Sequence, residues 1–282
     1  MGIILVPESP RWLLTKGRNA EALAILRKAA DGNGLDPMVT FPPGTYLIQQ
    51  EGGQHGSLSD LFSPKWLRTT LLLWVAWFGL AFVYYGTILA VSIIFTTVEE
   101  DRYGNDAGYV FDYPAIFISA SSEFVGLIMV LATIDRWGRI PTQTFTYTLG
   151  GFSCLFLCYA AHFGASRTVL VVLAFVARMA MMGATCTTWV STSEILTTDI
   201  RATGHGYANA MARIGGFFCP YVISENNKLN HIGLFLFLVS CVAAGVVWQL
   251  PETGGQNLGT EQYDESHGSE SPKKGPDYAR FD

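Results

Sequence analysis

The sequence has 282 residues, of which half are hydrophobic and only 15% are charged, and its mean hydropathy is positive. This balance excludes an ordinary soluble domain and is typical of a membrane protein. The net charge of −5 says little about partners, because most of the acidic excess lies in loops and the tail, and the lack of a basic cluster interleaved with aromatic residues argues against nucleic-acid binding.

Residues 1–68 are predicted to form a cytoplasmic segment with short amphipathic helices. Apolar side chains at helical spacing over residues 19–30 predict one such helix. Residues 31–56 are rich in glycine and proline and predict a loop, and residues 58–64 predict a second short helix. Residues 1–6 are apolar but too short to cross a bilayer, so we interpret them as the end of a span that begins upstream.

Six apolar runs of ~20 residues predict six transmembrane helices. They cover approximately Thr69–Phe95, Tyr113–Ile134, Ile140–Phe163, Thr168–Ser191, Thr203–Ser224 and His231–Leu250. The predicted fold is therefore an all-α membrane protein with a six-helix bundle over residues 69–250. The polar tail, residues 251–282, is rich in glycine and serine and is predicted to be disordered.

An even number of spans puts both ends of the chain on the same side of the membrane. Lysine and arginine are concentrated in the terminal segments and turns on that side, and only Arg102, Arg167 and Lys228 lie opposite. Because positive residues favour the cytoplasm, both termini are predicted to be cytoplasmic. Either the plasma membrane or an intracellular vesicle membrane is compatible with this topology.

Three ionisable residues, Glu123, Arg178 and Arg213, lie inside the predicted spans. At about 1.5 Å per residue, each lies about 15 Å from one end of its span, near the middle of the bilayer. A charge at that depth costs several kcal/mol unless it meets a partner or water, so we expect all three to face the interior. One interpretation is a structural Glu123–Arg178 ion pair. The other is a site for an anionic or carboxylate-bearing solute, or proton coupling through Glu123.

Charged residues also gather in the turns that the topology places on the cytoplasmic side. The candidates for a charged cluster at this face are Asp135, Arg136, Gly138, Arg139, Glu194, Arg201 and Glu252. Such a cluster can latch helix ends together and act as a gate when they separate. The alternative is that each charge only marks where a helix leaves the lipid.

Four short motifs resemble signatures of the major facilitator superfamily of transporters and occur in the same order. They are Pro7-Glu8-Ser9-Pro10-Arg11-Trp12-Leu13, the turn Asp135–Arg139, the segment Ser193–Arg201 followed by Gly204 and Gly206, and Pro251-Glu252-Thr253-Gly254. The sequence departs from these signatures where Ile140 replaces an arginine, where Ser193 and Thr197 replace prolines, and where the last motif lacks its lysine. Together with residues 69–74 and 84–86, the motifs are most similar to the synaptic-vesicle-2-related, organic-ion and sugar-porter-like members.

The resemblance covers nearly the whole chain but only the C-terminal half of the family's twelve-span architecture. It implies half of a secondary active transporter that moves a small organic solute by alternating access, with proton coupling as an option. The implied partner is a second six-span bundle, either the missing half or another copy. The resemblance also implies that Tyr84, Tyr85 and Trp189 line the solute cavity, whereas lone aromatic residues in spans more often face lipid or the core.

Two other interpretations stay open: a membrane binding or assembly protein that does not transport, and a truncated product of a full-length transporter gene. The sequence contains no nucleophile elbow, phosphate loop, catalytic carboxylate pair or zinc-ligand spacing. We therefore expect no enzyme activity, no cofactor and no metal site. The five cysteines fall inside apolar runs and are interpreted as packing residues, and the five histidines are scattered singly.

Overall fold

The computed structural model describes residues 7–47, 57–103, 111–224 and 227–254. Every regular element within these ranges is a helix, as the sequence predicts. The chain forms two compact units, Met1–His55 and Gly56–Asp282. The interpretation of residues 1–6 and the predicted disorder from residue 255 onward lie outside the described residues.

The first unit contains α2 (Pro10–Thr15), α3 (Asn19–Gly32) and α4 (Pro37–Thr40). The helix α3 confirms the one predicted over residues 19–30. The single turn α4 lies in the segment predicted to be a loop, so that prediction was wrong for these four residues. The Asp36 side chain accepts hydrogen bonds from the N–H groups of Met38 and Val39, and Pro37 occupies the first helical position. This cap and the fixed φ of proline stabilise a turn that has no apolar periodicity.

The second unit contains one short helix and six long ones. They are α5 (Leu58–Leu61), α6 (Leu67–Tyr103), α7 (Tyr113–Trp137), α8 (Arg139–His162), α9 (Arg167–Ile195), α10 (Thr198–Val222) and α11 (Leu229–Val247). Five of these, α6, α7, α8, α9 and α11, are long and apolar enough to cross a membrane. The helix α10 has 25 residues but is more polar, because it carries His205, Asn209 and Arg213. Its role as a sixth span stays a prediction.

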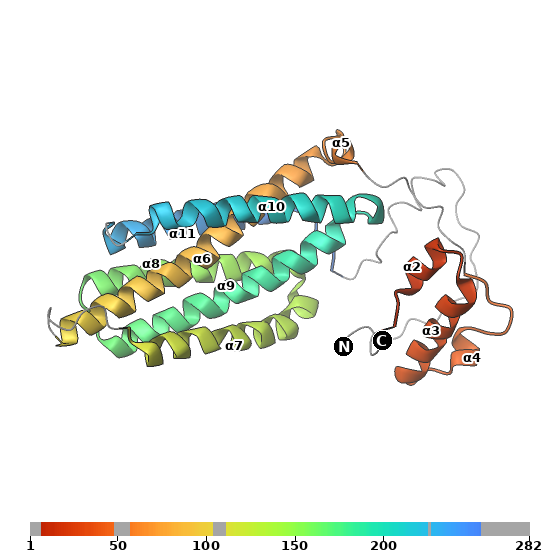
Figure 1. The fold of residues 1–282 in the computed structure, drawn as a ribbon, viewed down its shortest axis with the longest axis horizontal. Helices are drawn as coiled ribbons and strands as arrows, with labels where there is room; N and C mark the ends of the chain where they lie inside the picture. Colours follow the sequence, from red (N-terminus) through yellow and green to blue (C-terminus); the bar gives the residue numbers. More distant parts are fainter. Residues whose placement is uncertain (1–6, 48–56, 104–110, 225–226, 255–282) are drawn as a thin grey trace. The chain divides into compact units, whose positions relative to one another are not determined.

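The long helices pack around two central helices, α6 and α9 (Figure 1). The helix α7 packs against α9, and α10 packs against α6, so that α7 and α10 flank the two central helices on opposite sides. The helices α8 and α11 pack against each other and cover the back of α9 and α6. The face formed by α7, α9, α6 and α10 is thus left without a further layer within the described part of the chain.

Close packing of the flanking helices depends on glycines that face backbone atoms. A Cβ atom on Gly126 of α7 would lie 2.4 Å from the carbonyl oxygen of Met179 in α9. A Cβ atom on Gly215 of α10 would lie at the same 2.4 Å distance from the carbonyl oxygen of Phe78 in α6. No side-chain rotation relieves a clash with backbone, so α7 can approach α9, and α10 can approach α6, only where the approaching helix lacks a side chain.

The substitution Gly126→Ala is therefore expected to force α7 away from α9 and to lower the stability of the bundle by about 1–3 kcal/mol, the usual range for an overpacked core. The matched control is Gly245→Ala in α11, where nothing lies within 4 Å of an added Cβ. Alanine has the higher helix propensity, so the control should be neutral or stabilising by up to about 1 kcal/mol. Thermal unfolding of both variants in the same detergent measures the difference. Equal stability of the two variants would contradict the backbone-contact argument.

Candidate functional site

One face of α9 carries the residues around which the candidate site is built. Arg167, Arg178 and Trp189 recur at intervals of eleven residues. Eleven residues make about three helical turns, or about 16 Å, so the three side chains lie one above the other on the same face. Each of them contacts a partner from a neighbouring helix, so positions in the site are described by their level along α9.

At the middle level, Arg178 forms an ion pair with Glu123 of α7. The Arg178 Nη2 atom lies 2.6 Å from Glu123 Oε1, and the Tyr84 hydroxyl of α6 donates to the same oxygen over 3.3 Å. The two charged side chains are only 12% and 26% exposed. We call Glu123 and Arg178 the central pair. The contact considered from the sequence is present, and it joins α6, α7 and α9 at one level.

The aromatic candidates of α6 continue this level toward α10. The rings of Tyr84 and Tyr85 are in edge contact, with centroids 5.5 Å apart. Tyr85 packs toward Gly216 of α10, where an added Cβ would lie 3.1 Å from its ring. Arg213 is exposed and lies on the same side of α10 as His205 and Asn209, because these residues are four positions apart. Arg213 thus lies about one helical turn from Gly216, and no contact among the described residues joins it to the central pair.

The third of these α9 residues, Trp189, belongs to a cluster of three rings. The ring centroids are 5.0 Å apart for Trp77 and Trp189, 5.0 Å for Trp77 and His205, and 4.8 Å for Trp189 and His205. Trp77 is buried and donates from Nε1 to the Thr192 hydroxyl over 2.9 Å, whereas Trp189 is 45% exposed. We call these three residues the aromatic cluster. The sequence analysis included only Trp189, although the seven-residue spacing of Trp77 and Tyr84 was a usable signal that both lie on one face of α6.

Behind the aromatic cluster, buried polar side chains fasten α8 to α9. Gln143 Nε2 donates to the Thr188 hydroxyl over 2.7 Å, and the Tyr147 hydroxyl lies 3.1 Å from the same oxygen. Ser191 donates to Gln143 Oε1 over 3.1 Å. Buried polar groups that lose such partners carry a desolvation penalty of about 1–3 kcal/mol each, so this network fixes the register of the two helices.

A charged cluster lies where α7 ends and α8 begins. Arg139 donates to both oxygens of Glu194, over 2.8 Å and 3.1 Å, and to Asp135 over 3.0 Å. Thr253 donates from its hydroxyl to Glu194 over 2.6 Å. Glu252 accepts the backbone N–H groups of Arg139 and Ile140, each over 2.9 Å. We call the set Asp135, Arg139, Glu194, Glu252 and Thr253 the turn cluster.

Gly138 is required at the centre of the turn cluster for two reasons. Its φ of 92° lies in the region that favours glycine, and an added Cβ would lie 2.8 Å from the Glu252 carboxylate. Of the other predicted charges, Arg201 donates from Nε to the Leu196 carbonyl oxygen over 3.1 Å, and Arg136 is exposed. The contacts of the turn cluster therefore unite Asp135, Arg139, Glu194 and Glu252.

The sequence analysis missed an ion pair at the opposite end of α9. Arg167 Nη2 lies 2.7 Å from Asp112 Oδ1, and Arg167 Nε also contacts Asp112 Oδ2. Asp112 is buried and caps α7 by accepting the Ala115 N–H over 3.1 Å. We call Asp112 and Arg167 the end pair. Its signal was in the numbering, because the end pair and the central pair are both separated by 55 residues, as parallel helices in register require.

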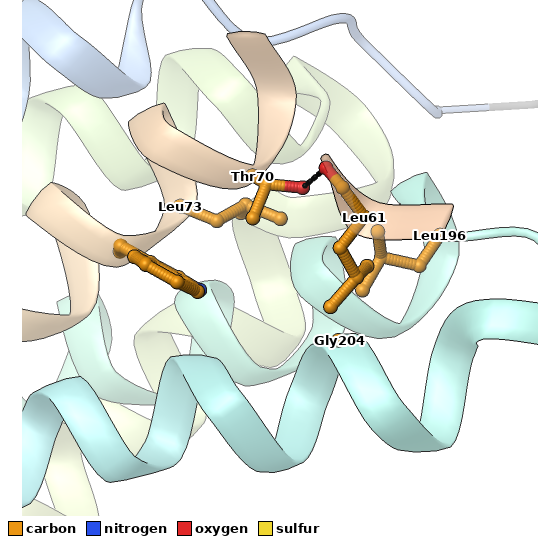
Figure 2. Close-up of a pocket in the computed structure, with 6 residues that line it drawn as sticks. Leu61, Thr70, Leu73, Leu196 and Gly204 are labelled. Atoms are coloured by element: carbon orange, nitrogen blue, oxygen red, sulfur yellow. Dashed lines mark hydrogen bonds between the residues drawn. The ribbon is translucent and has the colours of Figure 1, made fainter. Parts of the chain in front are cut away.

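The crevice in Figure 2 is a packing feature and not a ligand site. It is lined by Leu61, Thr70, Leu73, Trp74, Leu196 and Gly204, and its space is too small for a water molecule. Thr70 donates from its hydroxyl to the Leu61 carbonyl oxygen over 3.1 Å (Figure 2). This contact and the apolar lining hold α5 against the start of α6 and against α10.

Comparison with known proteins identifies related sequences over nearly the whole chain. Residues 1–265 match the family model described as sugar (and other) transporter. The chain is 33% identical to the synaptic vesicle 2-related protein of Xenopus laevis, over 90% of this chain and 47% of that protein. It is 32% identical to the organic cation/carnitine transporter 7 of Arabidopsis thaliana, over 89% of this chain and 57% of that protein. The chain thus spans about half the length of the curated relatives it matches.

A solved structure supports the fold. The proton:xylose symporter XylE, a major facilitator superfamily protein, is similar with a TM-score of 0.57 and 23% sequence identity, over 90% of this chain and 54% of that one. At this level of identity the likeness concerns the arrangement of helices alone.

The contribution of the central pair to folding can be measured with a double-mutant cycle. Glu123→Gln or Arg178→Gln alone leaves one charge without its partner in a low-dielectric environment, whereas the double substitution removes both charges. We expect the losses of stability of the two single variants to add up to more than the loss of the double variant. The difference, the coupling energy, should be on the order of 1–3 kcal/mol. Thermal unfolding of the four proteins in lipid gives this value. Purely additive losses would show that the contact contributes nothing to stability.

The turn cluster should make stability depend on acidic pH. Partial burial opposes ionisation of Glu252, but four backbone N–H donors, those of Arg139, Ile140, Gly254 and Thr253, outweigh it and lower the pKa of this carboxyl group. A lowered folded-state pKa means that the stabilisation is present above about 4.3, the usual value for glutamate, and is lost as the pH falls through the lower folded-state value. Glu252→Gln should therefore destabilise the bundle at pH 7, and the destabilisation should shrink as the pH is lowered toward 3. A destabilisation that is the same at both pH values would contradict the role of the charge.

Proposed function

Because the chain belongs to the sugar (and other) transporter family of the major facilitator superfamily, we propose that it acts as half of a secondary active transporter. It is a multi-pass membrane protein, and members of this family are transporters of small solutes and not enzymes. In the proposal, a small organic solute crosses the membrane by alternating access. Its binding site lies on the face formed by α6, α7, α9 and α10.

The observation that carries this proposal is the central pair with its hydroxyl partner. Glu123, Arg178 and Tyr84 come from three different helices and meet at a depth where charge is costly. Side chains that served only to pack these helices could be apolar, because replacing a buried ion pair by apolar residues is often neutral or stabilising. Polar groups that converge on an unlayered face therefore support a solute site at this level.

The balance of charge supports an anionic or carboxylate-bearing solute. Arg178 and Arg213 supply two positive charges on this face, and Glu123 supplies one negative charge. Tyr84 and Tyr85 add ring surface at this level, and the exposed part of Trp189 adds apolar ring surface about three helical turns further along α9. In this proposal Arg178 and Arg213 bind the anionic group and the aromatic residues contact the body of the solute.

The gate and the membrane topology belong to the same proposal. The turn cluster joins the ends of α7 and α9 to the start of α8, and separating these ends would break the Arg139–Glu194 contacts. Both termini are then cytoplasmic, residues 1–68 and the tail 251–282 lie in the cytoplasm, and α10 is the sixth span of the bundle over residues 69–250. A second six-span bundle, either another copy or a separate half, covers the solute site.

A second candidate is a membrane binding or assembly protein that does not transport. The observation that favours it is that the chain spans about half the length of its curated relatives. The two candidates differ in whether the chain moves a solute when it is assembled with itself.

Reconstitution at controlled protein density tests the proposal. The purified chain is placed in vesicles at one copy or at several copies per vesicle, and gradient-driven uptake is measured for organic anions, cations and sugars. We expect no uptake by single copies, and anion uptake that rises steeply with copy number. Arg213→Gln should reduce this uptake about ten-fold or more, as expected for loss of a charge-assisted hydrogen bond of about 1.5–3 kcal/mol. The matched control is Lys228→Gln, an exposed cation at the start of α11.

Saturable uptake by single copies would contradict the half-transporter proposal. Absence of uptake at every density, by a chain that is folded in the vesicles, would favour the second candidate.

A further inference from the structure

The central pair leaves hydrogen-bonding capacity unused on both of its members. Arg178 makes one hydrogen bond to Glu123, through Nη2 over 2.6 Å, and its Nε is buried without a partner among the described residues. Tyr84 donates to the same Glu123 oxygen, so Oε2 has no donor in the described part of the chain. An arginine and a carboxylate can form two parallel hydrogen bonds, and in this pair they form only one.

Two other buried or half-buried ion pairs of the bundle, Arg167–Asp112 and Arg139–Glu194, differ from the central pair in this respect. In the end pair, Arg167 contacts both oxygens of Asp112, and the same carboxylate also caps α7. In the turn cluster, Arg139 contacts both oxygens of Glu194. These two pairs have the two-point geometry of structural contacts. The central pair is joined by one hydrogen bond, so its arginine still has donors with which to bind another carboxylate.

We propose that Glu123 and the carboxylate of a solute compete for Arg178, and that one proton moves onto Glu123 for each solute bound. This inference rests on the proposed function, since it assigns the coupling step of the same site. Before binding, Arg178 and Glu123 form a pair of one cation and one anion. A solute carboxylate that took Arg178 from an ionised Glu123 would leave Glu123 charged and without its partner in a low-dielectric environment, at a cost of several kcal/mol. When a proton from solution binds Glu123, the solute carboxylate takes over the bond to Arg178, and the summed charge of Arg178, Glu123 and the bound carboxylate stays zero.

Two ionisable side chains contact Glu123 among the described residues, and the ionisable side chains named below on α8 and α10 make no described contact with it. Arg178 of α9 is the charged group opposite it, and Tyr84 of α6 is the neutral ionisable group beside it, with Tyr85 next along that helix. On α8, the buried Tyr147 directs its hydroxyl to Thr188 of α9, and Arg139 is held by Glu194. On α10, His205 belongs to the aromatic cluster and Arg213 is exposed. Protonated Glu123 keeps a partner when Arg178 is occupied, because a carboxylic acid can still accept a hydrogen bond from the Tyr84 hydroxyl.

Binding of benzoate by the purified full chain in lipid nanodiscs tests the exchange. Benzoate is the probe because it joins one carboxylate to a ring that suits the aromatic lining, and benzamide is its neutral control. We expect uptake of about one proton per benzoate bound, measured with a pH indicator in weakly buffered solution at pH 7. Glu123→Gln imitates the protonated side chain, so it should bind benzoate without proton uptake and with little dependence on pH. Arg178→Gln should lose at least ten-fold in affinity.

Thermal unfolding keeps the test independent of folding defects. Benzoate should raise the unfolding temperature of Glu123→Gln, because it supplies the anion that Arg178 has lost. Asp112→Asn in the end pair is the matched control. It should lower the unfolding temperature and leave the proton count unchanged, since the end pair lies about 16 Å from the central pair along α9.

Two results would overturn the exchange: benzoate binding to the unaltered chain without proton uptake, or loss of benzoate binding in a folded Glu123→Gln variant. Uptake of only neutral solutes by assembled chains that do not bind benzoate would overturn the exchange and leave the transport proposal standing. Proton-linked benzoate binding by a chain that transports nothing would do the reverse.

Discussion

A charge in the middle of a bilayer costs several kcal/mol unless it is paired or reaches water, and this constraint organises the seam between α7 and α9. The end pair fixes the seam where both helices begin, and the central pair joins them one three-turn interval further on. Gly126 allows the two backbones to touch next to the central pair. Because the helices are parallel and in register, the ionic contacts and the glycine contact are satisfied together, and α7 and α9 form one packed unit.

The same seam explains how the candidate site is supported from behind. The network of Gln143, Thr188 and Tyr147 fixes α8 to α9, and Trp77 is held in place by Thr192. The aromatic cluster therefore rests on a rigid layer, while the opposite surface of Trp189 stays exposed. A site that is rigid at the back and open at the front suits a solute that binds between two bundles. The turn cluster closes the other end of the seam, where Asp135 is exposed but Arg139 and Glu194 are only 17% and 19% exposed.

The motifs quoted from the sequence led to the correct family, and apolar run length led to five of the helices that can cross a membrane. Periodicity was less informative where caps decide local structure, as at Asp36–Pro37, and where a helix mixes small and polar residues, as in α10. For the candidate site, counting residues along each helix placed Glu123 and Arg178 at equivalent positions of their helices, and the structure shows them in contact. The sequence analysis did not single out Asp112, because one sequence does not say which acid at the end of a helix is buried.

The sequence by itself determined the class of protein, the positions of the long helices and the family, and it pointed to Glu123 and Arg178 as charges inside two of these helices. These properties depend on local composition and on fixed rises along the chain, so they need no knowledge of neighbours. Only the tertiary structure decided which charges share a contact, that the central pair is joined at one point and the end pair at two, and that Trp77 and His205 meet Trp189. Those properties depend on the register and rotation of helices that are distant in sequence, and sub-ångström differences in that packing decide whether an arginine uses one nitrogen or two.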